Sequence, residues 1–332
     1  MQTAQKGLAL AADLRASPGN FTVFYILAAK SYMGLGKLAT ALDYQQEGLR
    51  LSREINDPIQ ISRHYVNLGL VYNKLGRHGE AVDAMRQAAD VGRSVQDEKK
   101  SREMIAFSNL YLGEIYRDMG KYEDSVRAYQ EAQRFYSESE PDSTVLLFEA
   151  AKGELLTAIR GGDDSAAAKE LDQVLDFYEQ HRVNIEEESS RTAFFSREQG
   201  VYGIAIDFAY SRQQDERLAF DYSEMSRARS LLDTIQVPKR KLLDGPLPDV
   251  RFPSSTKPLS LDELQPRIPD RTYLLQYAVL DDKLVIWAVS KADLKSQVVS
   301  IRQEQLNAKV TAYLGALETE WRSRRGDPRP QA

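Results

Sequence analysis

Apolar residues recur along most of the chain with the spacing of amphipathic helices, and the helical stretches come in pairs separated by a glycine. Residues three and four apart share one face of a helix, so each such stretch predicts a helix that ends at its glycine. One block appears three times, the third in weaker form: Leu68-Gly69-x-x-Tyr72-x-x-Leu75-Gly76, Leu112-Gly113-x-x-Tyr116-x-x-Met119-Gly120 and Ala28-Ala29-x-x-Tyr32-x-x-Leu35-Gly36.

The agreement continues past each glycine into a second helix. Gly76 is followed by Ala81 and Met85, and Gly120 by Tyr129 and Ala132. This pattern resembles the tetratricopeptide repeat, a helix-turn-helix unit whose small residues let two helices approach closely. The three turn glycines are 40 and 44 residues apart, against about 34 in the standard unit, so we expect helices about one turn longer at their outer ends.

Two more hairpins are predicted beyond the clear repeats. Residues 145–159 and 166–175 flank Gly161-Gly162, and residues 202–210 and 218–222 flank a polar turn; the first helix of this last pair is expected to begin near Glu187. Pro58 and Pro141 fall between units, where a proline opens a helix. Residues 1–14 read as the second helix of a hairpin whose first helix is missing.

Such arrays wind into a superhelix whose concave face is lined by the first helix of each repeat. The residues expected to pack the repeats are Gly69, Tyr72, Gly76, Ala81, Gly113, Tyr116, Gly120 and Ala132. The polar residues expected to line a peptide groove are Asn67, Asn73, Lys74, Asn109, Arg117 and Asp118. Amides can bond a peptide backbone, and the two cations can pair with a ligand carboxylate.

A second informative segment is Ala219-Phe220-Asp221-Tyr222-Ser223-Glu224-Met225-Ser226-Arg227-Ala228-Arg229-Ser230-Leu231-Leu232-Asp233. It resembles the segment that closes the repeat array in bacterial proteins with a CHAT domain, the caspase-like protease domain associated with tetratricopeptide repeats. Taken alone, its apolar residues also fit an ordinary amphipathic helix.

The helical spacing of apolar residues ends at about residue 236. Residues 237–270 are rich in proline and read as a linker, with a single helical turn at 261–264. Residues 271–280 and 284–290 predict a β-hairpin, 297–301 a third strand, and 302–324 a helix. With Tyr277 and Trp287 in place, this stretch is similar to the opening of a CHAT domain.

The predicted fold is therefore an all-α tetratricopeptide-repeat superhelix of about five hairpins, followed by a small α/β segment. The predicted domains are the solenoid at 1–236, the linker at 237–270, a truncated CHAT opening at 271–324 and a disordered tail at 325–332.

Composition narrows the function classes. A net charge of -5 and a pI near 5.5 give no reason to expect nucleic acid, and no apolar run is long enough to predict a membrane span. The chain has no cysteine, which excludes disulfides and thiol nucleophiles and suggests a cytoplasmic protein. The CHAT resemblance implies a His and Cys dyad well downstream, which this sequence does not contain. We expect no protease activity from the chain as written.

Other candidates for chemistry are few. His64, His78 and His181 do not pair at metal-ligand spacing and are expected to be solvent-exposed or at helix ends. Glu186, Glu187 and Glu188 point in different directions on a helix and read as a solvated helix start. The sequence thus predicts no catalytic, cofactor or metal site.

Three hypotheses follow. The first is a protein-interaction scaffold, the regulatory half of a bacterial repeat-plus-CHAT protein, whose partners are a peptide in the groove and the rest of its own CHAT domain. The second is an N-terminal fragment of an active caspase-like protease whose catalytic residues lie beyond residue 332. The third is a regulator that pairs strands through an exposed hairpin carrying Trp287 and Tyr277.

Overall fold

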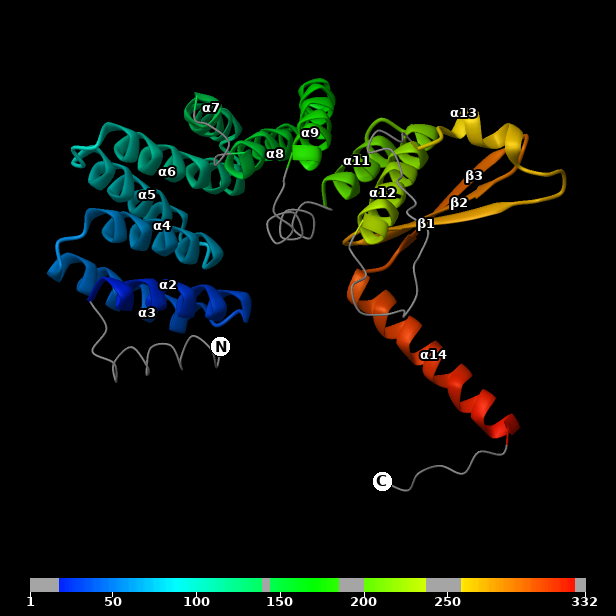
Figure 1. The fold of residues 1–332 in the computed structure, drawn as a ribbon, viewed down its shortest axis with the longest axis horizontal. Coiled ribbons are helices and arrows are strands. Elements are labelled where there is room, and N and C mark those ends of the chain that lie inside the picture. The colour runs from blue at the N-terminus through cyan, green and yellow to red at the C-terminus, as the bar shows by residue number, and fades with distance from the viewer. Residues whose placement is uncertain (1–17, 139–143, 185–199, 237–257, 326–332) are drawn as a thin grey trace. The chain divides into compact units, whose positions relative to one another are not determined.

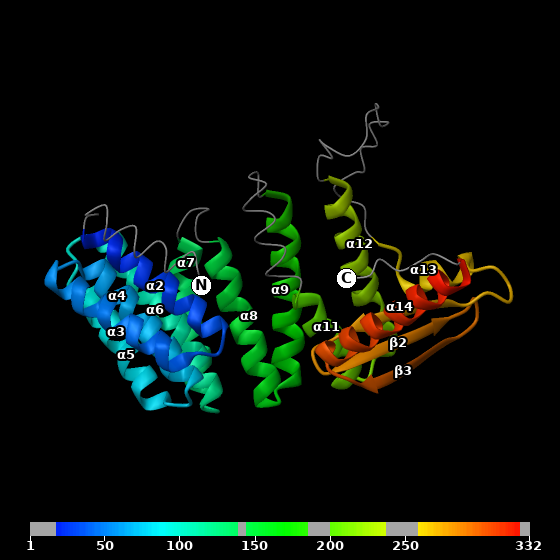
Figure 2. The same cartoon turned by 90° about the horizontal axis from the view of Figure 1, so that it is seen from below.

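The computed structural model describes residues 18–138, 144–184, 200–236 and 258–325, which form two compact units divided between Asn184 and Ile185. In the first unit, eight described helices pair into four successive hairpins (Figures 1 and 2). They are α2 (Pro18–Gly34) with α3 (Leu38–Glu54), α4 (Pro58–Lys74) with α5 (His78–Arg93), α6 (Glu98–Asp118) with α7 (Tyr122–Glu138), and α8 (Thr144–Gly161) with α9 (Asp164–Asn184). The repeat pattern and its continuation into a fourth hairpin are confirmed.

The turns within the hairpins depend on glycine. Gly36, Gly76, Gly120 and Gly162 all have φ between 70° and 77°, a left-handed conformation that only glycine adopts without strain. The hairpins are separated by polar caps: the Asp57 side chain accepts from the backbone N–H groups of Ile59 and Gln60, and Pro58 opens α4 as expected.

Packing inside the hairpins depends on small residues opposite large ones. A Cβ on Gly69 would lie 2.7 Å from Met85 Cε, and a Cβ on Gly113 would lie 2.8 Å from the Tyr129 ring. The same ring would be 2.3 Å from a Cβ on Gly153 in the next hairpin. One aromatic side chain therefore fills the space left by two glycines.

The second unit combines a helix pair with a sheet. The described helices α11 (Gly200–Ser211) and α12 (Glu216–Gln236) are followed by the single turn α13 (Leu261–Leu264) and a 3-10 turn at Gln265–Arg267. Strands β1 (Leu274–Val279), β2 (Lys283–Val289) and β3 (Leu294–Ser300) form an antiparallel sheet in the order β1-β2-β3, and α14 (Gln303–Arg325) follows. The α/β character of this segment is confirmed, and β3 begins three residues earlier than predicted.

One face of the sheet is buried against the helix pair. Trp287 is 0% exposed and meets the rings of Tyr210 and Phe220 edge-on, with centroids 6.5 and 6.1 Å apart. The expectation that Trp287 is exposed on an unpaired hairpin is therefore wrong, because α11 and α12 cover it. Tyr277, on the other face, is 53% exposed.

The predicted linker ends inside this unit. Leu261 is 1% exposed, and its backbone N–H donates to Asp221 Oδ1 at 2.7 Å. Residues 258–270 therefore belong with α12 and the sheet. The predicted helix at residues 1–14, the proline at 141, the helix start near Glu187 and the tail from 326 lie outside the described residues, as does the linker from 237 to 257. Among the described residues, no helix is long and apolar enough to cross a membrane.

A buried histidine joins the first two hairpins. His64 is 0% exposed, its Nδ1 lies 2.6 Å from Gln45 Oε1, and burial lowers its pKa to about 4. The expectation of an exposed histidine is wrong here, because the ring occupies the space that Gly48 leaves free of a side chain.

We predict that Gly48→Ala destabilises the protein by about 1–3 kcal/mol, because the new Cβ would lie 2.1 Å from His64 Cε1 in a packed core. Chemical denaturation measures the change. Gly79→Ala is the matched control: a Cβ there meets nothing within 4 Å, so that variant should be neutral or more stable. Equal stability of the two variants would contradict this account of the packing.

Candidate functional site

The first helices of successive hairpins lie next to one another, α2 beside α4, α4 beside α6 and α6 beside α8. A polar chain links three of them. Asn73 Nδ2 on α4 donates to Asp118 Oδ2 on α6 at 2.8 Å, and Arg160 Nη1 on α8 donates to Asp118 Oδ1 at 2.6 Å. We call the side of α4, α6 and α8 that carries this chain the inner face.

Asp118 is the centre of the chain. Burial alone would raise the pKa of its carboxyl, but the hydrogen bonds from Asn73 and Arg160 outweigh burial and lower it. Asp118 is therefore charged at neutral pH. Its bonds contribute stability that is lost only as the pH falls through this lowered pKa.

Further charges lie one turn away on α6. Glu114 is half-buried, and burial raises the pKa of its carboxyl while the charges of Arg117 and Lys74 oppose that rise. Arg117 Nη1 donates to the hydroxyl of Tyr129 at 3.0 Å, so one inner-face cation is held by the ring that packs the repeats. On α8, Glu149 and Lys152 form an ion pair at 3.3 Å. The inner face thus presents charges of both signs.

The structure brings together four of the six residues predicted for the groove. Asn73, Lys74, Arg117 and Asp118 lie at the ends of α4 and α6 on the inner face, although Asn73 is 8% exposed and is bonded to Asp118. Lys74 is exposed and has no ion pair among the described residues.

The other two lie elsewhere. Asn67 is 6% exposed and donates to the carbonyl of Arg63 in its own helix, so it does not reach a groove. Asn109 lies nine residues from Asp118, which places it on the opposite side of α6 at 3.6 residues per turn. A polar residue on a first helix therefore need not lie on the inner face.

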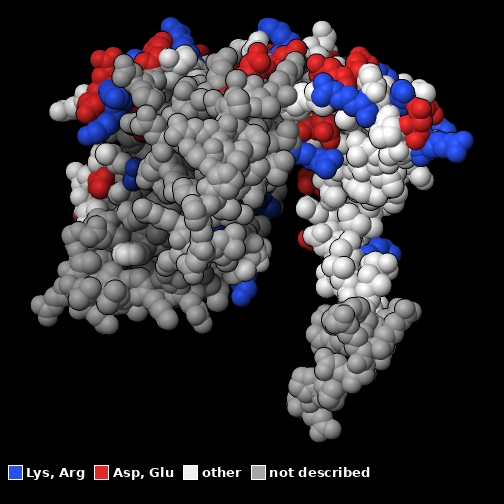
Figure 3. Space-filling view, turned by 45° about the vertical axis from the view of Figure 1, so that its right-hand side comes forward, with Lys and Arg blue, Asp and Glu red and all other residues white. Residues whose placement is uncertain are grey.

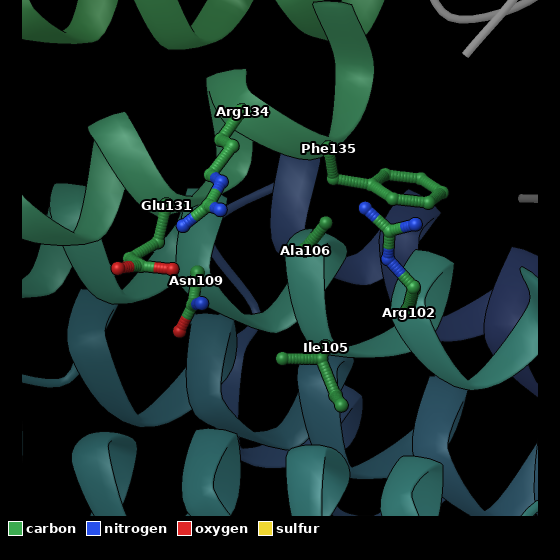
Figure 4. Close-up of a pocket in the computed structure, with 7 residues that line it drawn as sticks. All are labelled: Arg102, Ile105, Ala106, Asn109, Glu131, Arg134 and Phe135. Carbon is green, nitrogen blue, oxygen red and sulfur yellow. The ribbon is translucent and has the colours of Figure 1, made fainter. Parts of the chain in front are cut away.

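Asn109 instead lines a pocket of about 290 Å³ between α6 and α7 (Figure 4). Ile105, Ala106 and Phe135 are its apolar lining. The Arg102 guanidinium lies 5.5 Å from the centroid of the Phe135 ring. Glu131, Arg134 and Asn109 lie together on the other side in Figure 4. The pocket is separate from the inner face.

The predicted packing residues have the expected surroundings. Ala81 and Ala132 are 0% exposed, Tyr72 and Tyr116 are half-buried against the core of the second and third hairpins, and Gly76 and Gly120 form turns. Gly69 and Gly113 face Met85 and Tyr129.

Two important residues, Arg160 and Glu154, were not identified from the sequence. Arg160 stands two positions before the turn glycine Gly162, the same position that Lys74 and Asp118 occupy before theirs, so its register could have identified it. Glu154 is 7% exposed, and burial raises the pKa of its carboxyl to about 7. No sequence signal distinguishes it from a surface glutamate.

No metal site is evident in the described part of the chain, where no three His, Asp or Glu side chains gather. His78 Nδ1 lies 2.8 Å from Asn73 Oδ1 at the start of α5, a helix-end position as expected. The side chains of His181 and Glu186 to Glu188 lie outside the described residues.

Comparison with known proteins agrees with the fold. Residues 22–94 and 109–138 match models of the tetratricopeptide repeat, so this part of the chain carries tetratricopeptide repeats. It is 29% identical over 104 residues to the Photosystem I assembly protein Ycf3 of Synechococcus elongatus and of another Synechococcus strain. That match covers 31% of this chain and 57% of the length of those relatives.

Among solved structures, BtubC (BKLC) from P. vanneervenii aligns with a TM-score of 0.52 and 16% identity, over 75% of this chain and 97% of that chain. This likeness concerns the fold alone. The apo form of RapI aligns with a TM-score of 0.48 and 14% identity, over 70% of this chain and 76% of that chain.

We predict that Glu154→Gln stabilises the protein above pH 7 by about 1–3 kcal/mol. The pKa of Glu154 is raised in the folded state, so at low pH its carboxyl is neutral and its burial costs little. As the pH rises through about 7, the carboxyl becomes charged in the core and stability is lost. Thermal unfolding at pH 5 and pH 8 tests this: the gain should appear at pH 8 and shrink at pH 5. The exposed carboxylate of Glu123 supplies a control, and a gain of equal size from Glu123→Gln would contradict the assignment.

Proposed function

We propose that the chain is a protein-interaction scaffold that binds a peptide segment of a partner along the inner face of its repeats. The observation that supports this proposal is the row of charged side chains on adjacent first helices. Lys74, Glu114 and Arg117 lie around the hydrogen-bonded chain of Asn73, Asp118 and Arg160. A row of this kind is suited to an extended segment, because its charges lie on neighbouring helices along the repeat array.

The charges favour a ligand of mixed sign. Lys74 is exposed and has no ion pair among the described residues, so its ammonium group can form a charge-assisted hydrogen bond with a ligand carboxylate. Glu114 lies close enough to Lys74 and Arg117 for their charges to affect its pKa, so it can accept from a ligand N–H. Asp118 is already bonded to Asn73 and Arg160, and its role is to hold the helices that present the other groups.

We further propose that this scaffold is the regulatory half of a bacterial repeat-plus-CHAT protein, that it works in the cytoplasm, and that the chain itself carries no catalytic group. Support comes from contacts between residues 219–233 and residues 271–324, the two stretches that resemble such proteins. Phe220 packs on Trp287, Ser223 accepts from Gln276 at 2.8 Å, and Arg227 donates to the same Gln276 at 3.2 Å. Ligand binding on the repeats would then regulate a protease supplied by the remainder of the domain.

The alternative is that the chain is the N-terminal part of an active caspase-like cysteine protease with its His and Cys beyond residue 332. The observation that favours it is the exposed apolar surface of β1, where Leu275 and Tyr277 are 55% and 53% exposed, because a larger domain would bury these residues. Reading the coding sequence past codon 332 distinguishes the two: an open frame with a His and then a Cys supports the protease, and a stop codon in a complete genome eliminates it.

The binding site is tested by charge reversal. Peptides recovered from a displayed library against the whole chain should bind Lys74→Glu at least about tenfold more weakly, because one charge-assisted hydrogen bond is lost. Arg86→Glu, an equal charge reversal at an exposed position on the second helix α5, is the control and should bind normally. Equal loss in both variants, or no loss in either, would overturn the assignment of the inner face.

A further inference from the structure

In the described part of the second unit, no helix or strand covers one face of the sheet. The register places Leu275, Tyr277 and Val279 of β1 on the same side as six residues of β2 and β3. Seven of these nine residues are apolar or aromatic, and the two polar ones, Lys295 and Gln297, are both on β3. The nine residues are Leu275, Tyr277, Val279, Leu284, Ile286, Ala288, Lys295, Gln297 and Val299. We call this surface the open face.

An apolar open face is unusual for an antiparallel sheet. When one face of such a sheet contacts water, its strands alternate between apolar residues inside and polar residues outside. Here Val279 is 46% exposed and Val299 is 38% exposed on the open face. The other face, which carries Trp287, is already buried against α11 and α12. The sequence is that of a sheet covered on both sides.

The helix α14 carries a matching surface. Leu306, Val310, Tyr313, Leu314 and Leu317 recur at helical spacing, and the last four are between 43% and 64% exposed. In Figure 1, α14 continues from the end of β3 without lying over the sheet. Figure 3 shows that the surface of the described part of α14 is mostly uncharged. Most helical stability in proteins comes from packing of an apolar face, so α14 needs a partner surface.

The two surfaces agree in length. The stripe from Leu306 to Leu317 extends about 16 Å at 1.5 Å per residue. Strands of six and seven residues extend about 20 Å. One helix of this kind is long enough to cross the apolar part of the open face.

The connection from β3 to α14 decides which copy of the sheet is covered. Only Ile301 and Arg302 separate the two elements. The N–H groups of Ile301 and Gln303 donate to the carbonyls of Asp282 and Asp281, both at 3.2 Å, and hold the start of α14 on the β1–β2 turn. With both bonds in place, α14 runs away from its own sheet (Figure 1). A short, tethered connection instead favours exchange of the helix between two copies.

We propose that two copies of the chain exchange α14, so that the helix of each lies across the open face of the other. The arrangement is two-fold symmetric and closed, since each copy offers one helix and one face. Both tethering bonds are kept, and both apolar surfaces are buried. The dimer is independent of peptide binding on the inner face.

The test is the mass of the whole chain in solution, measured by light scattering and sedimentation. The unaltered chain should be a dimer. Val310→Asp combined with Leu314→Asp should weaken the dimer roughly a hundredfold or more, because two buried apolar side chains are lost. Ala308→Asp combined with Thr311→Asp adds the same charges on the other side of α14 and should stay dimeric. Circular dichroism and thermal melting check that all variants fold.

A mixing experiment separates exchange from closure within one copy. Leu275→Lys combined with Tyr277→Lys alters only the open face and should also give a monomer. Mixed with the α14 variant, it should form a heterodimer, because one intact helix then meets one intact face. An unaltered chain that is monomeric at all concentrations, whether α14 closes on its own sheet or another protein covers both surfaces, would overturn the proposal. So would two variants that fail to associate on mixing.

Discussion

The repeat array depends on the close approach of a single aromatic ring to two glycines. Tyr129 lies where side chains on Gly113 and Gly153 would have to be, so it fixes the distance between the third hairpin and the fourth. Its hydroxyl accepts from Arg117, which stands beside the inner-face carboxylates. Burial raises the pKa of this phenol, so it remains a neutral acceptor across the physiological range. Packing between repeats and the placement of inner-face charge are therefore one structural feature, and a change in the first alters the second.

The parts of the fold that follow from local chemistry were predictable. Four turn glycines with positive φ mark where one helix must end and the next begin, and the spacing of apolar residues gives the faces that pack. The strands were found because β-branched and aromatic residues cluster there, although the start of β3 was missed since Leu294 to Ser296 follow a polar turn and lack that enrichment.

The site was only partly predictable, because its residues depend on contacts across hairpins. Helical phase grouped Lys74, Arg117 and Asp118, which lie at the ends of α4 and α6 in the structure, but it could not show that Asn73 and Asp118, 45 residues apart, bond to each other. Nor could it show that Asn67 is buried, since a polar residue one position away in phase lies 100° around the helix. His64 and Glu154 are further cases: their burial is decided by Gly48 and by α7 and α9, which no local pattern around either residue encodes.

The two units use polar groups in opposite ways. In the repeats, bonds from Asn73 and Arg160 to Asp118 join neighbouring helices beside the other charged groups of the inner face. On the sheet of the second unit, Ser223 and Arg227 bond Gln276, which is 1% exposed, on the buried side, and the open face is mostly apolar. A peptide groove needs polar groups that can exchange water for a ligand, whereas an apolar sheet face gains stability only by being covered permanently. The repeats are therefore suited to a reversible partner and the sheet to a lasting one.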